Sequence, residues 1–139
     1  MLAFPVSCIL SKVSFAGESS GVLVVSEFSS VRKVSVLDIR RMYLGLPSPT
    51  NSLIKNTVIN FSDINVYNEF LKNVMHMTDR GYRRKIIKRI FRQGGKKVRE
   101  IHSIKELVKY LEQNPYDVSF MTKDVAMKTK GIKVVQVIW

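Results

Sequence analysis

The stretch Gly21-Val-Leu-Val-Val-Ser26 is an unbroken aliphatic run, and it decides the fold class. An alternating apolar and polar pattern would indicate a strand with one face in water, whereas a continuous run is typical of a strand buried on both faces. Residues 57–61, 118–122 and 132–138 also have strand character. These segments predict a parallel or mixed sheet that lies inside the protein.

The segments between these strands have the spacing of amphipathic helices. Ser35 stands at an N-cap position with Asp38 three residues later, and the helix should end at Gly45, before two prolines. Ser103 stands at a second N-cap position, with Glu106 three residues later. The expected helices run from Ser35 towards Gly45, carry Tyr67 to Val74, span residues 78–91 and run from Ser103 to Asn114.

The helix expected over residues 78–91 has an apolar stripe on one side. The stripe contains Tyr82, Ile86, Ile87, Ile90 and Phe91, and we expect it to face the core. Strands that alternate with helices favour an α/β fold, with a mixed and mostly parallel sheet flanked by helices.

Length and composition indicate one domain, which we place at residues 20–139. The chain has 139 residues, 45% of them hydrophobic, enough for a packed core.

Residues 1–16 are interpreted as a signal peptide or an apolar N-terminal tail, because an apolar run precedes the small residues Ser14 and Ala16. The first interpretation predicts an exported or periplasmic protein, and the second a cytoplasmic one. No run is long enough for a transmembrane helix.

The chain is strongly basic, with 23 Lys and Arg against 11 Asp and Glu and a net charge of +12. This balance favours anionic partners without choosing among phosphate groups, nucleic acid, anionic lipid and acidic proteins. The charge is concentrated between Arg80 and Arg99, where no acid occurs. This basic patch is either an interaction surface or a solvated face. Its members are Arg80, Arg83, Arg84, Lys85, Lys88, Arg89, Arg92, Lys96 and Lys97, with Arg99 at its end.

Residue patterns typical of catalysis or metal binding are absent from the sequence. The only histidines, His76 and His102, are far apart and have no second ligand at metal spacing. No nucleophile is paired with a base and an orienting acid, and no phosphate-binding Walker loop occurs. We therefore predict a protein without metal, cofactor or enzyme activity.

Four stretches together resemble the substrate-binding proteins of phosphate ABC transporters, and in particular short members with about one lobe. They are Ser35 to Gly45, Asn68 to Phe70, Tyr82 to Gly95, and Ser103 to Phe120. The resemblance implies a single lobe of the type 2 periplasmic-binding-protein fold. It also implies a non-enzymatic periplasmic binding or accessory protein.

The same resemblance locates the remnant of an anion site at Ser62, Asn65 and Tyr67. Family members hold the anion with an arginine and a Ser-Gly-Thr turn, but here Phe61 takes the arginine position and Asn65-Val66-Tyr67 replaces the turn. Losing the glycine puts side chains where the backbone should approach an anion. The implied ligand is phosphate or another small anion, bound weakly at a degenerate site.

An alternative hypothesis treats the chain as a basic interaction module. It would bind nucleic acid or an acidic protein through the Arg80 to Arg99 patch. Export would make nucleic acid the less favoured partner and would favour an acidic protein or another partner in the cell envelope. Exposed aromatic residues that stack on bases are not evident from the pattern.

Overall fold

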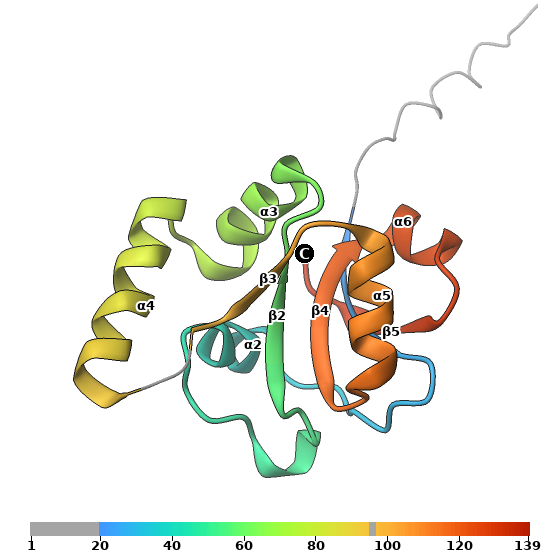
Figure 1. The fold of residues 1–139 in the computed structure, drawn as a ribbon, viewed down its shortest axis with the longest axis horizontal. Coiled ribbons are helices and arrows are strands. Elements are labelled where there is room, and N and C mark those ends of the chain that lie inside the picture. Colours follow the sequence, from blue (N-terminus) through green and yellow to red (C-terminus); the bar gives the residue numbers. More distant parts are fainter. Residues whose placement is uncertain (1–19, 95–96) are drawn as a thin grey trace, which may run out of the picture.

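A five-stranded mixed sheet forms the centre of the computed structural model, which describes residues 20–94 and 97–139 (Figure 1). The predicted signal peptide at residues 1–16 lies outside this range. The spatial order of the strands is β3-β2-β4-β1-β5. Their bounds are Gly21–Ser26 for β1, Asn56–Asn60 for β2, Arg99–Ile101 for β3, Asp117–Thr122 for β4 and Ile132–Val137 for β5.

The strand directions confirm the predicted mixed sheet. β2 pairs in parallel with β3 and β4, whereas β1 pairs antiparallel with both β4 and β5. β2, β3, β4 and β5 therefore point one way, and β1 runs against them between β4 and β5. The pairing of β1 with β5 shifts register between Leu23 and Val24.

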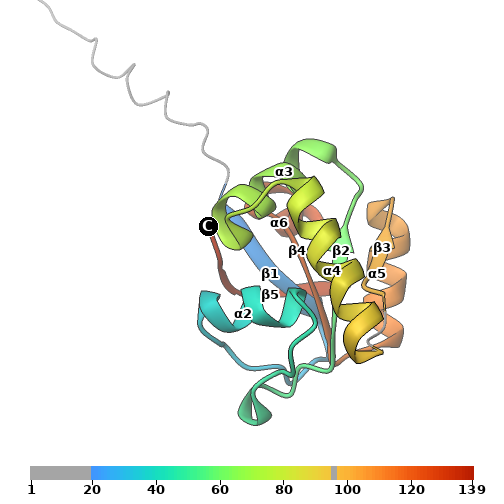
Figure 2. The ribbon, with the colours of Figure 1, turned by 90° about the vertical axis from the view of Figure 1, so that its left-hand side faces the viewer.

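Helices cover both faces of the sheet (Figures 1 and 2). Side chains of α2, α3 and α4 pack in the core of one face, and those of α5 and α6 in the core of the other. Their bounds are Val36–Tyr43 for α2, Ile64–Phe70 for α3, Asp79–Gln93 for α4, Ile104–Gln113 for α5 and Lys123–Lys128 for α6; a π-helical turn at Leu71–Met75 continues α3, and a 3-10 turn occupies Thr50–Ser52.

The predicted helix starts are confirmed by their capping hydrogen bonds. Ser35 Oγ accepts from the Asp38 N–H at 3.0 Å, and Ser103 Oγ accepts from the Glu106 N–H at 3.1 Å. These contacts satisfy amide groups that have no partner within the helix. β3 and α6 were not predicted, because three and six residues are too few to show a periodic pattern.

β1 contributes to both cores, as its unbroken apolar run predicts. Leu23 and Val25 pack in the cluster on the α2 and α3 face, while Val22 and Val24 pack in the cluster on the α5 face. In the first cluster, the ring of Phe70 stacks on that of Phe120 with centroids 4.0 Å apart. Helices and sheet are thus joined by apolar contacts on either side of β1.

The expected inward stripe of α4 is only partly correct. Tyr82 is buried and Ile86 packs on the core, but Ile87 is 54% exposed and Phe91 is 84% exposed. α4 lies at the β3 edge of the sheet (Figure 1), and β3 has only three residues. The protein therefore covers the side of α4 that carries Tyr82 and Ile86, and the adjacent side with Ile87 and Phe91 stays exposed. The Tyr82 hydroxyl donates to the backbone oxygen of Tyr43 at 2.6 Å and ties α4 to α2.

Replacing Tyr82 with Phe should destabilise the fold measurably. The buried oxygen of Tyr43 would lose its side-chain donor, which costs about 1 to 2 kcal/mol. Urea unfolding followed by circular dichroism measures this change. Tyr116→Phe is the matched control, because Tyr116 is 45% exposed. Equal stability of the two variants would contradict the role assigned to Tyr82.

Candidate functional site

Three parallel strands end at one edge of the sheet and bring distant parts of the chain together. Asn60 is the last residue of β2, His102 follows β3, and Thr122 is the last residue of β4. The following segments enter helices α3, α5 and α6. Ligands of open α/β sheets bind outside the carboxyl ends of such strands. This carboxyl edge is therefore the first place to look for a site.

A cavity of about 440 Å³ opens at the carboxyl edge. The N-cap residues of all three following helices line it: Asp63 of α3, Ser103 of α5 and Thr122 of α6. Its other polar lining residues are Asn60, Ser62 and His102, and its apolar walls are Val66, Ile104, Met121 and Val125. The starts of three helices thus border one space, although only α5 is longer than seven residues.

The turn after β2 is held by its own side chains. The Asn60 side chain donates to the backbone oxygen of Phe120 at 2.8 Å, and its Oδ1 accepts from the Ser62 N–H at 3.0 Å and the Ser62 hydroxyl at 2.6 Å. Asp63 Oδ1 accepts from the Asn65 N–H at 2.9 Å and so caps α3. A carboxylate therefore already occupies the N-terminus of α3.

The three predicted anion-site residues do not all reach this cavity. Ser62 lines it, whereas Asn65 is exposed on the first turn of α3 and is not among the lining residues. Tyr67 is buried, and its hydroxyl donates to Asp79 Oδ1 at 2.6 Å. Burial, reinforced by this hydrogen bond, raises the pKa of Tyr67 well above its usual value.

Phe61, at the position where the resemblance implies an arginine, is part of an aromatic stack. Its ring lies 4.6 Å from that of Tyr67 and 5.3 Å from that of His102, between centroids. The guanidinium of Arg83 is 5.8 Å from the Phe61 centroid, but it pairs with Asp79 at 2.9 Å and Glu100 at 3.1 Å. Arg83 is thus bound to carboxylates and does not line the cavity.

The basic patch lies apart from the cavity. From Arg80 to Arg92 its members are on α4, Arg99 is the first residue of β3, Lys97 lies two residues before it, and Lys96 is outside the described residues. None of the described members lines the carboxyl-edge cavity. Two surfaces therefore need separate explanations.

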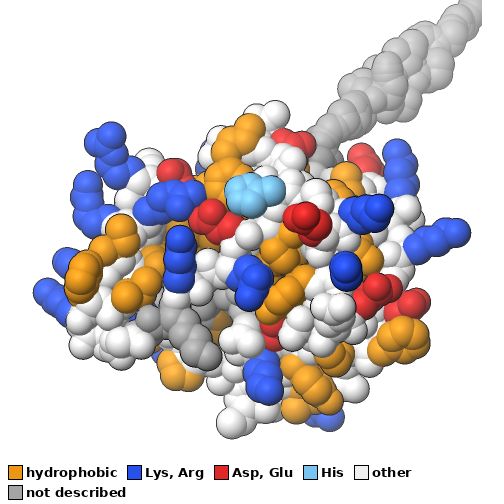
Figure 3. All heavy atoms as spheres, in the orientation of Figure 1, with side chains coloured by type: hydrophobic (Ala, Val, Ile, Leu, Met, Phe, Trp, Pro, Cys, Tyr) orange, Lys and Arg blue, Asp and Glu red, His pale blue; other side chains and the backbone are white. Residues whose placement is uncertain are grey.

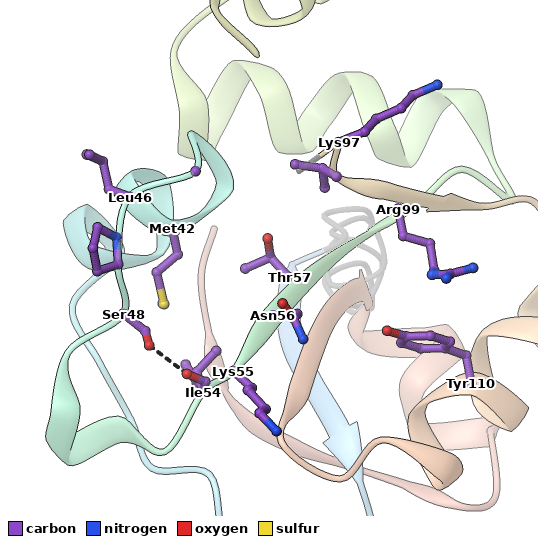
Figure 4. A pocket seen from close by; sticks show the side chains of 13 residues that line it. Met42, Leu46, Ser48, Ile54, Lys55, Asn56, Thr57, Lys97, Arg99 and Tyr110 are labelled. Carbon is purple, nitrogen blue, oxygen red and sulfur yellow. Dashed lines mark hydrogen bonds between the residues drawn. The ribbon is translucent and has the colours of Figure 1, made fainter. Parts of the chain in front are cut away.

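A second hollow, of about 470 Å³, lies at the amino ends of β2 and β3. Lys55, Lys97 and Arg99 line it, but their side chains extend in different directions (Figure 4). Arg99 lies over the ring of Tyr110, 5.1 Å from its centroid. The cations do not converge on one point, so this hollow is less suited to a small anion than the carboxyl-edge cavity.

Among the polar lining residues, the sequence did not indicate Asn60, His102, Ser103 or Thr122 as parts of a site. Ser103 was recognised as a helix cap, but its proximity to Ser62 depends on strand order and not on spacing along the chain.

Within residues 20–94 and 97–139, no three His, Cys, Asp or Glu side chains are grouped to hold a metal ion. In the same part of the chain, the helices are too short or too polar to cross a bilayer.

Comparison with solved structures shows that this fold resembles part of two transport receptors. The ABC-type phosphate transport receptor from Vibrio cholerae matches with a TM-score of 0.59 and 14% identity, over 85% of this chain and 46% of the receptor. PstS from Borrelia burgdorferi matches with a TM-score of 0.58 and 13% identity, over 85% of this chain and 47% of that one. This chain thus spans less than half the length of each receptor.

These matches confirm the predicted fold, an α/β lobe like those of periplasmic binding proteins. At such low identity they establish the fold and leave the ligand to be argued from the residues. No protein-family model matches the chain, and no curated protein matches it in sequence.

Tyr110, beside the second hollow, should make stability fall at alkaline pH. Burial and its hydrogen bond to the Asp117 carboxylate raise the pKa of Tyr110 from 10.0 to about 12. The unfolded chain loses this proton near pH 10, while the folded chain keeps it until about pH 12. The stabilisation is complete below pH 10 and is lost as the pH rises through about 12.

Urea unfolding of Tyr110→Phe across this alkaline range tests the assignment. The variant should lose less stability than the parent chain between neutral and alkaline pH. Tyr116→Phe, on an exposed ring, should follow the parent. A Tyr110→Phe profile parallel to that of the parent would contradict the assignment.

Proposed function

We propose that this chain is an exported, non-enzymatic solute-binding lobe that takes a small anion, such as phosphate, weakly in the carboxyl-edge cavity. The observation that carries the proposal is the meeting of three helix N-termini, those of α3, α5 and α6, at one cavity. Backbone N–H groups and helix dipoles at such termini attract negative charge. Serine and threonine hydroxyls at the same place add donors.

The charges of the cavity make the proposed binding weak. Its lining includes the carboxylate of Asp63 and no Lys or Arg among the described residues. An anion would gain from the helix dipoles but would meet a like charge on Asp63, already hydrogen-bonded to the backbone of α3. This combination supports the hypothesis of a degenerate anion site.

The fold adds a further reason for weak binding. The two matched structures are phosphate receptors, and this chain corresponds to less than half of either. A ligand held by one lobe stays in contact with solvent, so its hydrogen bonds gain less than in an enclosed site. We therefore propose an accessory or receptor-like role.

Export remains part of the proposal. A signal peptide at residues 1–16 would leave the lobe at residues 20–139 as the mature domain. Mass spectrometry of the protein from its native cell tests this directly. A mature N-terminus near Gly17 supports export, and an intact Met1 would count against it.

Calorimetric titration of the chain with inorganic phosphate tests the anion site. We expect saturable binding by the parent and tighter binding by Asp63→Asn, because this change removes the repelling charge and keeps a side chain that can cap α3. Glu27→Gln is the charge-matched control, since Glu27 is exposed and lies outside the cavity lining.

Ser103→Ala should weaken phosphate binding by removing a hydroxyl from the cavity. Its matched control is Ser35→Ala, which deletes an equivalent N-cap on α2, away from the cavity. Each loses about 1 kcal/mol of stability, so only a binding difference between them reports on the site. Absence of heat at millimolar phosphate in both the parent and Asp63→Asn would refute the anion proposal.

A further inference from the structure

α4 presents an exposed apolar pair that the fold leaves uncovered. Ile87 is 54% exposed and Phe91 is 84% exposed, and they lie four residues apart on the same side of the helix. Exposed apolar residues that occur singly are ordinary on protein surfaces. Here the pair is continuous with a further apolar surface.

That surface is a hollow of about 330 Å³ between α4 and the sheet edge. Its apolar walls come from Ile59, Tyr82, Ile86, Ile90 and Val98, and Ile87 stands at it as well. Ile86, Ile90 and Val98 are partly exposed and extend the apolar surface beyond Ile87 and Phe91, and we call this surface the apolar strip. The charged side chains of Arg83, Lys97 and Glu100 complete the lining of the hollow.

Exposed positive charges lie along this strip. Arg80, Arg84 and Lys88 are exposed and follow the strip along α4. Glu100, which lines the hollow, and Asp79, on α4, both pair with Arg83. Figure 3 shows basic side chains beside hydrophobic ones over the end of the molecule that α4 occupies in Figure 1.

We propose that this face of α4 docks on the surface of an anionic lipid bilayer. A helix that lies in a membrane interface needs apolar side chains to enter the boundary of the acyl chains and Lys or Arg to meet the phosphates, and α4 exposes both. The charge complementarity favours lipid phosphate over a second copy of this basic chain. A nucleic acid would use the cations and gain little from Ile87. This inference does not depend on the anion cavity.

Co-sedimentation with vesicles measures the binding. The probes are phosphatidylcholine vesicles and vesicles in which about one third of the lipid is phosphatidylglycerol. We expect the chain to prefer the anionic vesicles and the preference to shrink as salt is added, because salt screens exposed charges. Equal binding to both kinds of vesicle would overturn the proposal.

Variants separate the apolar contribution to membrane docking from the electrostatic contribution. Phe91→Ser should weaken binding to anionic vesicles roughly tenfold or more, while Phe28→Ser, at a loop residue that is 79% exposed, should leave it unchanged. The double variant Arg84→Glu, Lys88→Glu should also weaken binding roughly tenfold or more. Lys105→Glu with Lys109→Glu on α5 is its charge-matched control.

The variant Phe91→Trp reports whether the side chain at position 91 enters the bilayer. The signal comes from this position, so it is independent of any vesicle binding by residues 1–19. Emission from this tryptophan should be quenched by brominated acyl chains in anionic vesicles, beyond the quenching of the parent chain with Trp139 alone. No added quenching would overturn the proposal. So would duplex DNA binding that exceeds vesicle binding and is unaffected by Phe91→Ser, which would assign the cations to nucleic acid.

Discussion

The burial of β1 on both faces is the constraint on which the rest of the structure depends. All six of its residues are buried, and alternate side chains belong to the two separate cores. Placing β1 between β4 and β5 joins the C-terminal strand to the remainder of the sheet, and the sheet in turn supports helices on each side. A polar residue at Leu23 or Val24 would be buried without a partner, whichever face it entered.

The site follows from the direction of the strands. Because β2, β3 and β4 are parallel, the turns after them lie together although Asn60 and Thr122 are far apart in the chain. The N-cap residues of α3, α5 and α6 lie at this shared edge and line the cavity. The chemistry at this edge is then decided by few side chains, chiefly the carboxylate of Asp63 and the hydroxyls of Ser62 and Ser103.

The protein separates its positive charge from this cavity. The cations of α4 lie at the sheet edge beside β3, where Arg83 is neutralised by Asp79 and Glu100 and its neighbours remain exposed. The large net charge is therefore no argument for a strong anion site. It belongs to a different surface, which also carries the apolar side chains of Ile87 and Phe91.

The sequence by itself determined the fold class, the buried strand β1 and the capped helices, because periodicity and capping act within a few residues. The resemblance to phosphate-binding proteins also pointed to Ser62 as a site residue. Tertiary structure alone decided that Ser103 and Thr122 line the same cavity as Ser62. It also decided that the Tyr67 hydroxyl donates a hydrogen bond to Asp79 and that Phe91 is exposed to solvent. The reason is that these outcomes depend on strand order and on which side of a helix another element covers, and neither is encoded in local spacing.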